Sequence, residues 1–117
     1  MSIRVLVVED QPAVRLLALD ILADAGFETA EASNAAQALE LLRSPEHDID
    51  VLFTDVRMPG AMDGFELASV AKRKHPELHV IVTSGYFDRK ELPQGTTFIQ
   101  KPWSAVDLIS KVMRAAA

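Results

Sequence analysis

The sequence predicts an α/β fold in which helices cover both faces of one parallel sheet. Short, β-branched apolar runs alternate with longer segments whose apolar residues recur at helical spacing. A residue with a carboxylate, hydroxyl or amine group directly follows four of the five runs. The chain has 117 residues, 49% of them hydrophobic and 25% charged, which suits an ordered domain with one core. We expect that domain to span residues 1–117.

Five segments are predicted to be strands. Residues 3–8 are short and almost continuously apolar, as expected of a strand buried on both faces. Residues 50–54 and 78–82 have the same character, and residues 97–100 form a shorter run. Residues 27–32 alternate between apolar and polar, which predicts a less buried strand.

Four full-length helices are predicted between and after these strands. The first begins at Pro12, which suits the first turn of a helix, and is closed by Gly26. Asn34 can N-cap the second, which runs to Arg43. The remaining two cover residues 63–74 and 103–116.

Apolar spacing also predicts which residues of the first and last helices face the core. In the first helix these residues are Val14, Leu17, Ile21 and Leu22. In the last helix they are Val106, Ile109, Val112 and Met113. Each helix is therefore expected to pack one face on the sheet.

The stretch between the fourth and fifth strands is short for a crossover. Residues 84–94 include Gly85 and Pro93, and a full crossover helix needs more room. We therefore expect a shortened fourth helix there, of one or two turns around residues 87–92. A fourth helix of three or more turns would contradict this expectation.

The order of the elements predicts the topology of the sheet. Alternating strands and helices imply parallel strands joined by right-handed crossovers. Five strands suit the flavodoxin-like, doubly wound order 2-1-3-4-5, in which ligands bind where strands 1 and 3 diverge. Glu9 and Asp10 follow the first strand, and Asp55 follows the third. Three carboxylates are therefore expected at the switch point.

The residue types at this edge of the sheet predict a phosphoryl site. Mg²⁺ prefers carboxylate, water and phosphate oxygens, and Glu9, Asp10 and Asp55 can supply carboxylates. Three close carboxylates repel one another and raise at least one pKa unless a cation is present. Thr83 follows the fourth strand and Lys101 the fifth, so a hydroxyl and an ammonium group are available to a bound phosphoryl group.

Composition excludes several other classes of protein. The net charge is −5, and a nucleic-acid surface needs clustered Lys and Arg. The chain has no cysteine, which excludes disulfides and thiolate zinc sites. It has no signal-peptide pattern and no apolar segment of membrane-spanning length, so we expect a cytoplasmic protein without nucleic-acid or membrane partners.

Five motifs closely resemble the receiver domain of two-component response regulators, of the chemotaxis-regulator type. They are Val-Val-Glu-Asp at 7–10, Thr-Asp-Val-Arg-Met-Pro at 54–59, Met-Asp-Gly at 62–64, Val-Thr-Ser-Gly at 82–85 and Ile-Gln-Lys-Pro at 99–102. The resemblance covers residues 3–116. It implies a Mg²⁺-dependent phosphoacceptor that assists its own phosphorylation and dephosphorylation and is not otherwise an enzyme.

The resemblance assigns a role to each matching residue. Asp55 corresponds to the phosphoacceptor, which takes a phosphoryl group from a phosphohistidine of a sensor histidine kinase or a histidine phosphotransfer protein. The implied Mg²⁺ ligands are Asp10, Glu9 partly through water, Asp55 and the backbone carbonyl of Arg57. Lys101 and Thr83 correspond to the phosphate-reading pair. Thr83 and Phe98 correspond to the switch residues, and the bond between Lys101 and Pro102 is commonly cis in the family.

The resemblance also implies where partners bind and where this chain departs from the pattern. The kinase or phosphotransfer partner is expected at residues 12–19 together with Pro102 and Trp103, whereas the downstream target stays open. A shortened fourth helix disfavours a dimer through that helix. The loop of residues 58–64 is one residue longer than usual. Arg57 and Gly85 flank the path of a water attacking an aspartyl phosphate, so we expect R57A to change the phosphate half-life.

Three other functions fit the sequence less well than a receiver domain. A haloacid-dehalogenase-like hydrolase requires a second Asp two residues after the first, where this chain has Arg57. An FMN or nucleotide binder needs a Gly- or Ser/Thr-rich loop after the first strand, and Glu9 and Asp10 stand there. The intact set of acids, threonine and lysine counts against a phosphorylation-independent interaction module. The start at Met1 favours a stand-alone regulator over a receiver cut from a hybrid kinase.

Overall fold

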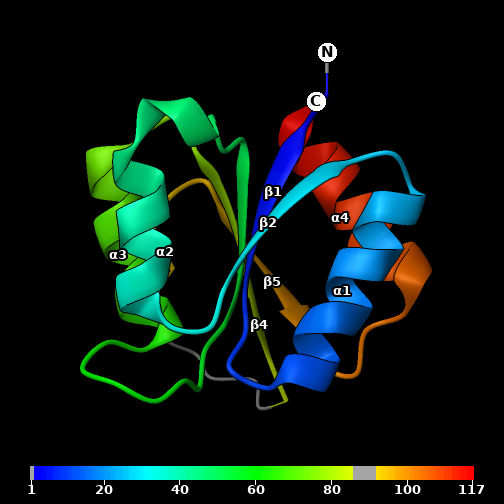
Figure 1. The fold of residues 1–117 in the computed structure, drawn as a ribbon, viewed down its shortest axis with the longest axis horizontal. Coiled ribbons are helices and arrows are strands. Elements are labelled where there is room, and N and C mark those ends of the chain that lie inside the picture. Colours follow the sequence, from blue (N-terminus) through cyan, green and yellow to red (C-terminus); the bar gives the residue numbers. More distant parts are fainter. Residues whose placement is uncertain (1, 86–91) are drawn as a thin grey trace.

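The computed structural model describes residues 2–85 and 92–117, which form an α/β fold with a central sheet (Figure 1). The strands are β1 (Arg4–Val8), β2 (Glu28–Ala32), β3 (Val51–Asp55), β4 (His79–Ser84) and β5 (Thr96–Gln100). The helices are α1 (Pro12–Asp24), α2 (Ala35–Arg43), α3 (Gly64–Lys74) and α4 (Ala105–Ala116), and a 3-10 turn, η1 (Pro45–His47), precedes β3. All neighbouring strands are parallel and their order is β2-β1-β3-β4-β5, which confirms the predicted topology.

The sheet separates two apolar cores, because side chains alternate between its faces. Leu6, Leu52 and Val80 lie side by side in register and pack on α2 and α3. Their neighbours in the sequence, such as Phe53 and Ile81, pack on α1 and α4. Figure 1 shows the two helix pairs on opposite sides of the sheet. With both faces covered, the central strands are buried as their apolar runs predicted.

The helix ends follow local sequence signals. Asn34 caps α2 by accepting a hydrogen bond from the Gln37 N–H at 2.8 Å, as predicted. Gly26, with a φ of +96°, closes α1. The last helix begins at Ala105, two residues later than predicted, because Ser104 and Asp107 form a capping box.

The predicted inward faces of α1 and α4 were partly wrong. Leu17, Val106 and Met113 were expected in the core, but they are 54%, 76% and 59% exposed. The residues that α1 and α4 bury are Ala18 and Leu22, and Leu108 and Val112. Both helices therefore leave apolar side chains at the surface.

The predicted short helix around residues 87–92 falls almost wholly outside the described residues. On either side of that gap, Gly85 and residues 92–95 are not helical. In the part of the chain that the structure describes, no helix is both long and apolar enough to span a bilayer.

Candidate functional site

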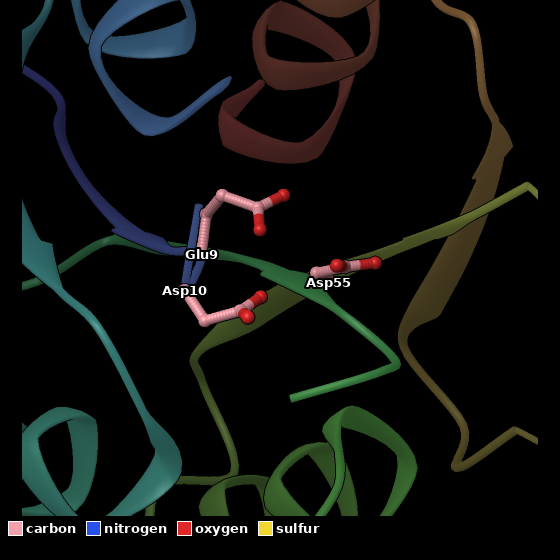
Figure 2. A group of neighbouring side chains, drawn as sticks. All are labelled: Glu9, Asp10 and Asp55. Atoms are coloured by element: carbon pink, nitrogen blue, oxygen red, sulfur yellow. The ribbon is translucent and has the colours of Figure 1, made fainter. Parts of the chain in front are cut away.

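Three carboxylates meet at the carboxyl edge of the sheet, where the loops after β1 and β3 diverge. Each of Glu9, Asp10 and Asp55 places one carboxylate oxygen within 4.8 Å of the other two (Figure 2). Glu9 and Asp55 are buried, and Asp10 is half-buried. Within residues 2–85 and 92–117, this is the cluster of acidic side chains that could hold a metal ion.

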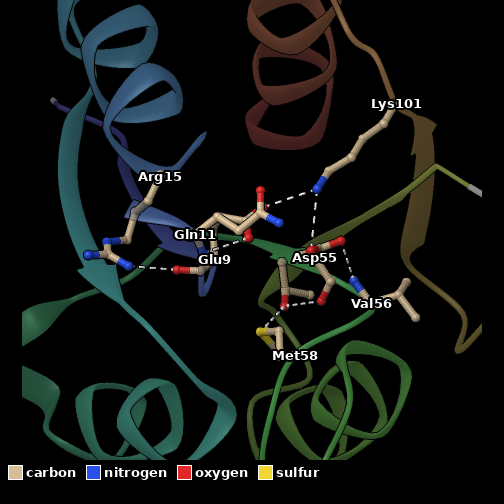
Figure 3. A network of polar contacts seen from close by, with 8 residues as sticks. Glu9, Gln11, Arg15, Asp55, Val56, Met58 and Lys101 are labelled. Carbon is tan, nitrogen blue, oxygen red and sulfur yellow. Dashed lines mark hydrogen bonds and ion pairs between the residues drawn. The ribbon is translucent and has the colours of Figure 1, made fainter. Parts of the chain in front are cut away.

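Lys101 brings a positive charge to the two buried carboxylates. Its Nζ lies 3.1 Å from Oε1 of Glu9 and 3.3 Å from Oδ2 of Asp55 (Figure 3). Its backbone N–H donates to the carbonyl of Ser84 at 2.9 Å, which extends the pairing of β4 and β5 by one step. The Lys101–Pro102 peptide bond is cis, as the family resemblance implied.

The protonation of Glu9 and Lys101 reflects this arrangement. Burial raises the pKa of Glu9, and hydrogen bonds from the Gln11 N–H and Lys101 only partly offset it. For Lys101, burial alone would lower the pKa, but the hydrogen bond to Glu9 and the charges of Asp55 and Glu9 outweigh burial and raise it. The site therefore keeps its ammonium group charged and favours an added cation or proton at Glu9.

Backbone N–H groups hold the other carboxylate oxygens. The Gln11 N–H donates to Oε2 of Glu9 at 3.1 Å, and the Val56 N–H donates to Oδ1 of Asp55 at 2.9 Å. The Thr54 hydroxyl donates to the backbone carbonyl of Asp55 at 2.9 Å. The directions of Glu9 and Asp55 are thus fixed by the strands and loops that carry them.

The predicted switch residues lie on the neighbouring strands. Thr83 is paired in register with Asp55 and is buried, and among the described residues its Oγ1 has no hydrogen-bond partner. Phe98 lies opposite Val82 on β5 and packs against the core on the α2 and α3 side. The geometry brings Thr83 beside Asp55, and the switching roles stay predictions.

Helix α3 begins directly against the phosphoacceptor candidate. The Gly64 N–H donates to the carbonyl of Val56 at 2.8 Å, and a Cβ on Gly64 would lie 2.0 Å from the carbonyl oxygen of Asp55. Only glycine permits this approach.

Between β3 and α3, Arg57 is exposed and lines a hollow of about 550 Å³ together with Asp10. The metal-binding role of the Arg57 carbonyl stays a prediction.

The sequence did not predict one side chain that supports Glu9 and Asp10. Arg15 donates from Nη1 to the backbone carbonyl of Glu9 at 2.8 Å, and from Nε to Oε1 of Glu31 at 3.0 Å. One signal was available, since Arg15 is the only charged residue among residues 12–19. Gln11 acts through its backbone, so its side-chain type gave no signal.

Comparisons with known proteins agree with this geometry. The family model described as "Response regulator receiver domain" matches residues 5–113. The chain is 30% identical to the response regulator receiver protein CpdR of Brucella abortus, over 93% of this chain and 92% of that protein. It is 34% identical to the sensor kinase CckA of Brucella abortus, over 95% of this chain.

The larger relatives extend well beyond the matched region. The chain spans 12% of the length of CckA and 24% of that of NtrC from Escherichia coli, to which it is 35% identical. Among solved structures, a CheY-like receiver domain protein from Methanospirillum hungatei has a TM-score of 0.91 at 26% identity, covering 99% of this chain and 94% of that one.

Proposed function

The chain belongs to the response regulator receiver domain family, and on that premise we propose that Asp55 is its phosphoacceptor. The phosphoryl donor is a phosphohistidine of a sensor histidine kinase or a histidine phosphotransfer protein. One carboxylate oxygen of Asp55 forms a bond to phosphorus while the P–N bond breaks, and the imidazole, protonated on its other ring nitrogen, leaves with the electron pair. The observation that carries this proposal is the buried Asp55 carboxylate, with Lys101 3.3 Å away and two further carboxylates beside it.

Mg²⁺ is the cofactor that suits this donor set. Glu9, Asp10 and Asp55 offer hard oxygen ligands at the carboxyl ends of two adjacent strands, and the backbone carbonyl of Arg57 is proposed as a further ligand. When bound, Mg²⁺ supplies positive charge that offsets the three carboxylates and the incoming phosphoryl group. Lys101 adds its ammonium group on the side of Glu9 and Asp55.

Thr83 and Phe98 are proposed to report the phosphorylated state. The Thr83 hydroxyl is buried beside Asp55 and has no hydrogen-bond partner among the described residues, so a phosphoryl oxygen would offer it an acceptor. Phe98 lies on β5, the strand next to that of Thr83, so a shift of Thr83 would change the packing around β5. The surface of β5 would then pass the signal to a downstream protein, whose identity stays open.

The partner that delivers the phosphoryl group is proposed to dock on α1 and the loop before α4. Val14, Leu17, Pro102 and Trp103 line a hollow of about 440 Å³ that includes Lys101. Leu16 and Leu17 expose apolar area on the same helix. An apolar surface next to the site would let a helical partner bring its phosphohistidine to Asp55. Such donors are made from ATP, so we also propose a cytoplasmic location.

A small phosphodonor tests the proposal without a partner protein. Incubation with radiolabelled acetyl phosphate and Mg²⁺ should label the protein with hydroxylamine-sensitive phosphate. D55N should lose the label, whereas D24N, which changes an exposed aspartate at the end of α1, should keep it. Chelation of Mg²⁺ should abolish labelling of the wild type. Equal labelling of D55N and the wild type would refute Asp55 as the acceptor.

A further inference from the structure

The side chain of Arg15 links the loop that begins at Glu9 to strand β2. From the first turn of α1 it reaches back to the loop after β1, where Nη1 donates to the Glu9 carbonyl at 2.8 Å. Its Nε donates to Oε1 of Glu31, on β2, at 3.0 Å. The Arg15 side chain is 18% exposed, whereas that of Glu31 is 57% exposed. Figure 3 shows Arg15 on the side of Glu9 opposite to Lys101.

This contact fixes a peptide group between two proposed metal ligands. The carbonyl of Glu9 and the N–H of Asp10 belong to one rigid peptide plane. The Glu9 N–H is itself held by the carbonyl of Ala32 at 3.1 Å. With both its N–H and its carbonyl held, the backbone of Glu9 has little freedom to rotate. The directions in which Glu9 and Asp10 leave the backbone are then set.

We propose that Arg15, anchored by Glu31, is a positioning residue that holds the Glu9 and Asp10 carboxylates in the arrangement that binds Mg²⁺. Arg15 contacts the backbone of Glu9 and acts through that residue, as outer-shell partners of metal ligands do. The proposal rests on the metal site described above and adds a determinant of its affinity. It also extends the site to an exposed residue on an edge strand, Glu31.

The charge of Arg15 and its contact with Glu9 predict opposite changes in Mg²⁺ affinity when Arg15 is replaced. A cation near three carboxylates competes with Mg²⁺, so removal of the charge alone would tighten metal binding. Removal of the positioning contact would weaken it. Substitution of Arg15 by methionine, which is apolar and of similar reach, removes both contacts and the charge. The sign of the change in Mg²⁺ affinity therefore separates the two effects.

The test is calorimetric titration of Mg²⁺ into the unphosphorylated full chain. We expect R15M to raise the Kd about tenfold, the lower end of the usual effect of an outer-shell partner. R43M, which removes an exposed arginine paired with Glu40 on α2, is the matched control and should leave the Kd unchanged. A Kd for R15M equal to or below that of the wild type would overturn the proposal. A wild type that binds no Mg²⁺ would overturn the metal site itself.

A double-mutant cycle tests the anchoring by Glu31. If Glu31 acts through Arg15, E31Q should weaken Mg²⁺ binding in the wild type and add nothing in R15M. If E31Q changes the Kd equally in the wild type and in R15M, Glu31 acts through its charge alone, and the proposal that it anchors Arg15 is overturned. Melting in EDTA checks that each variant is folded. If R15M is too unstable to titrate, the Asp10 and Gln11 amide resonances of E31Q decide, and unshifted resonances would overturn the proposal.

Discussion

The ammonium group of Lys101 lies 3.1 Å from Oε1 of Glu9, although the two residues are 92 positions apart in the sequence. The contact joins the ends of β1 and β5, which are separated in the sheet by β3 and β4. Both groups are more easily protonated than usual, since the pKa of Glu9 and the pKa of Lys101 are raised. The pair thus links the proposed metal site to the stability of the fold.

The raised pKa of Glu9 predicts that, in the absence of metal, the fold loses stability as the pH rises. The folded state binds the Glu9 proton more tightly than the unfolded state, so this carboxyl stabilises the fold fully only below its ordinary pKa of 4.5. That contribution is lost as the pH rises through the raised pKa. In EDTA, E9Q should therefore gain stability relative to the wild type as the pH rises from 4.5 towards neutrality. Urea unfolding at several pH values measures this difference.

Two controls define that experiment. E77Q, at an exposed glutamate, corrects for the loss of one negative charge. Mg²⁺ should remove the trend by favouring ionised Glu9. Lys101 does not contribute in this range, because its raised pKa affects stability only above about 10.5. A difference between E9Q and the wild type that is constant with pH would contradict the prediction.

The unpartnered hydroxyl of Thr83 predicts a stabilising substitution. Valine has nearly the same shape, and an unsatisfied buried hydroxyl costs about 1 kcal/mol or more. T83V should therefore raise the free energy of unfolding of the unphosphorylated protein by about 1 kcal/mol. T97V, at an exposed position on β5, is the matched control. A destabilised T83V would show that the hydroxyl is satisfied in the unphosphorylated state.

The strands and the site could be predicted because each depends on one simple property. Buried parallel strands are continuous apolar runs, and a polar residue marks where each run leaves the core. Topology alone then brings Glu9, Asp55 and Lys101 to one edge of the sheet. No side-chain contact had to be known in advance.

The buried face of α1 could not be assigned from periodicity. Residues 16–19 of α1 are all apolar, so several phases of the helix fit the pattern equally well. The structure buries Ala18 and exposes Leu16 and Leu17, because the small side chain lets α1 lie close to the sheet. The contact of Arg15 with Glu9 could not be predicted for a different reason: its acceptor is a backbone carbonyl, so the sequence shows an isolated charged residue but not its partner.

Lys72 predicts a stability effect away from the site. Its Nζ donates to the carbonyls of Pro76 and Leu78, both at 2.8 Å, and so ties the end of α3 to the start of β4. K72M removes two charge-assisted hydrogen bonds and should lower the free energy of unfolding by about 1–2 kcal/mol. K74M, two residues later and exposed, should have a smaller effect. Equal effects of K72M and K74M in urea unfolding would contradict a specific role for Lys72.

Gly64 predicts a substitution that damages both fold and site. An alanine Cβ would lie 2.0 Å from the carbonyl oxygen of Asp55 and 2.7 Å from the Cα of Val56, and neither backbone atom can turn aside as a side chain could. G64A should therefore push α3 away from β3 and cost about 2 kcal/mol or more, as in an overpacked core. The same displacement should slow labelling of Asp55 by acetyl phosphate. G85A is the control for the unfolding measurement, since no described atom lies within 4 Å of its added Cβ. If G64A and G85A unfold at the same urea concentration, the prediction is contradicted, because the first turn of α3 can then shift to accept a Cβ without loss of stability.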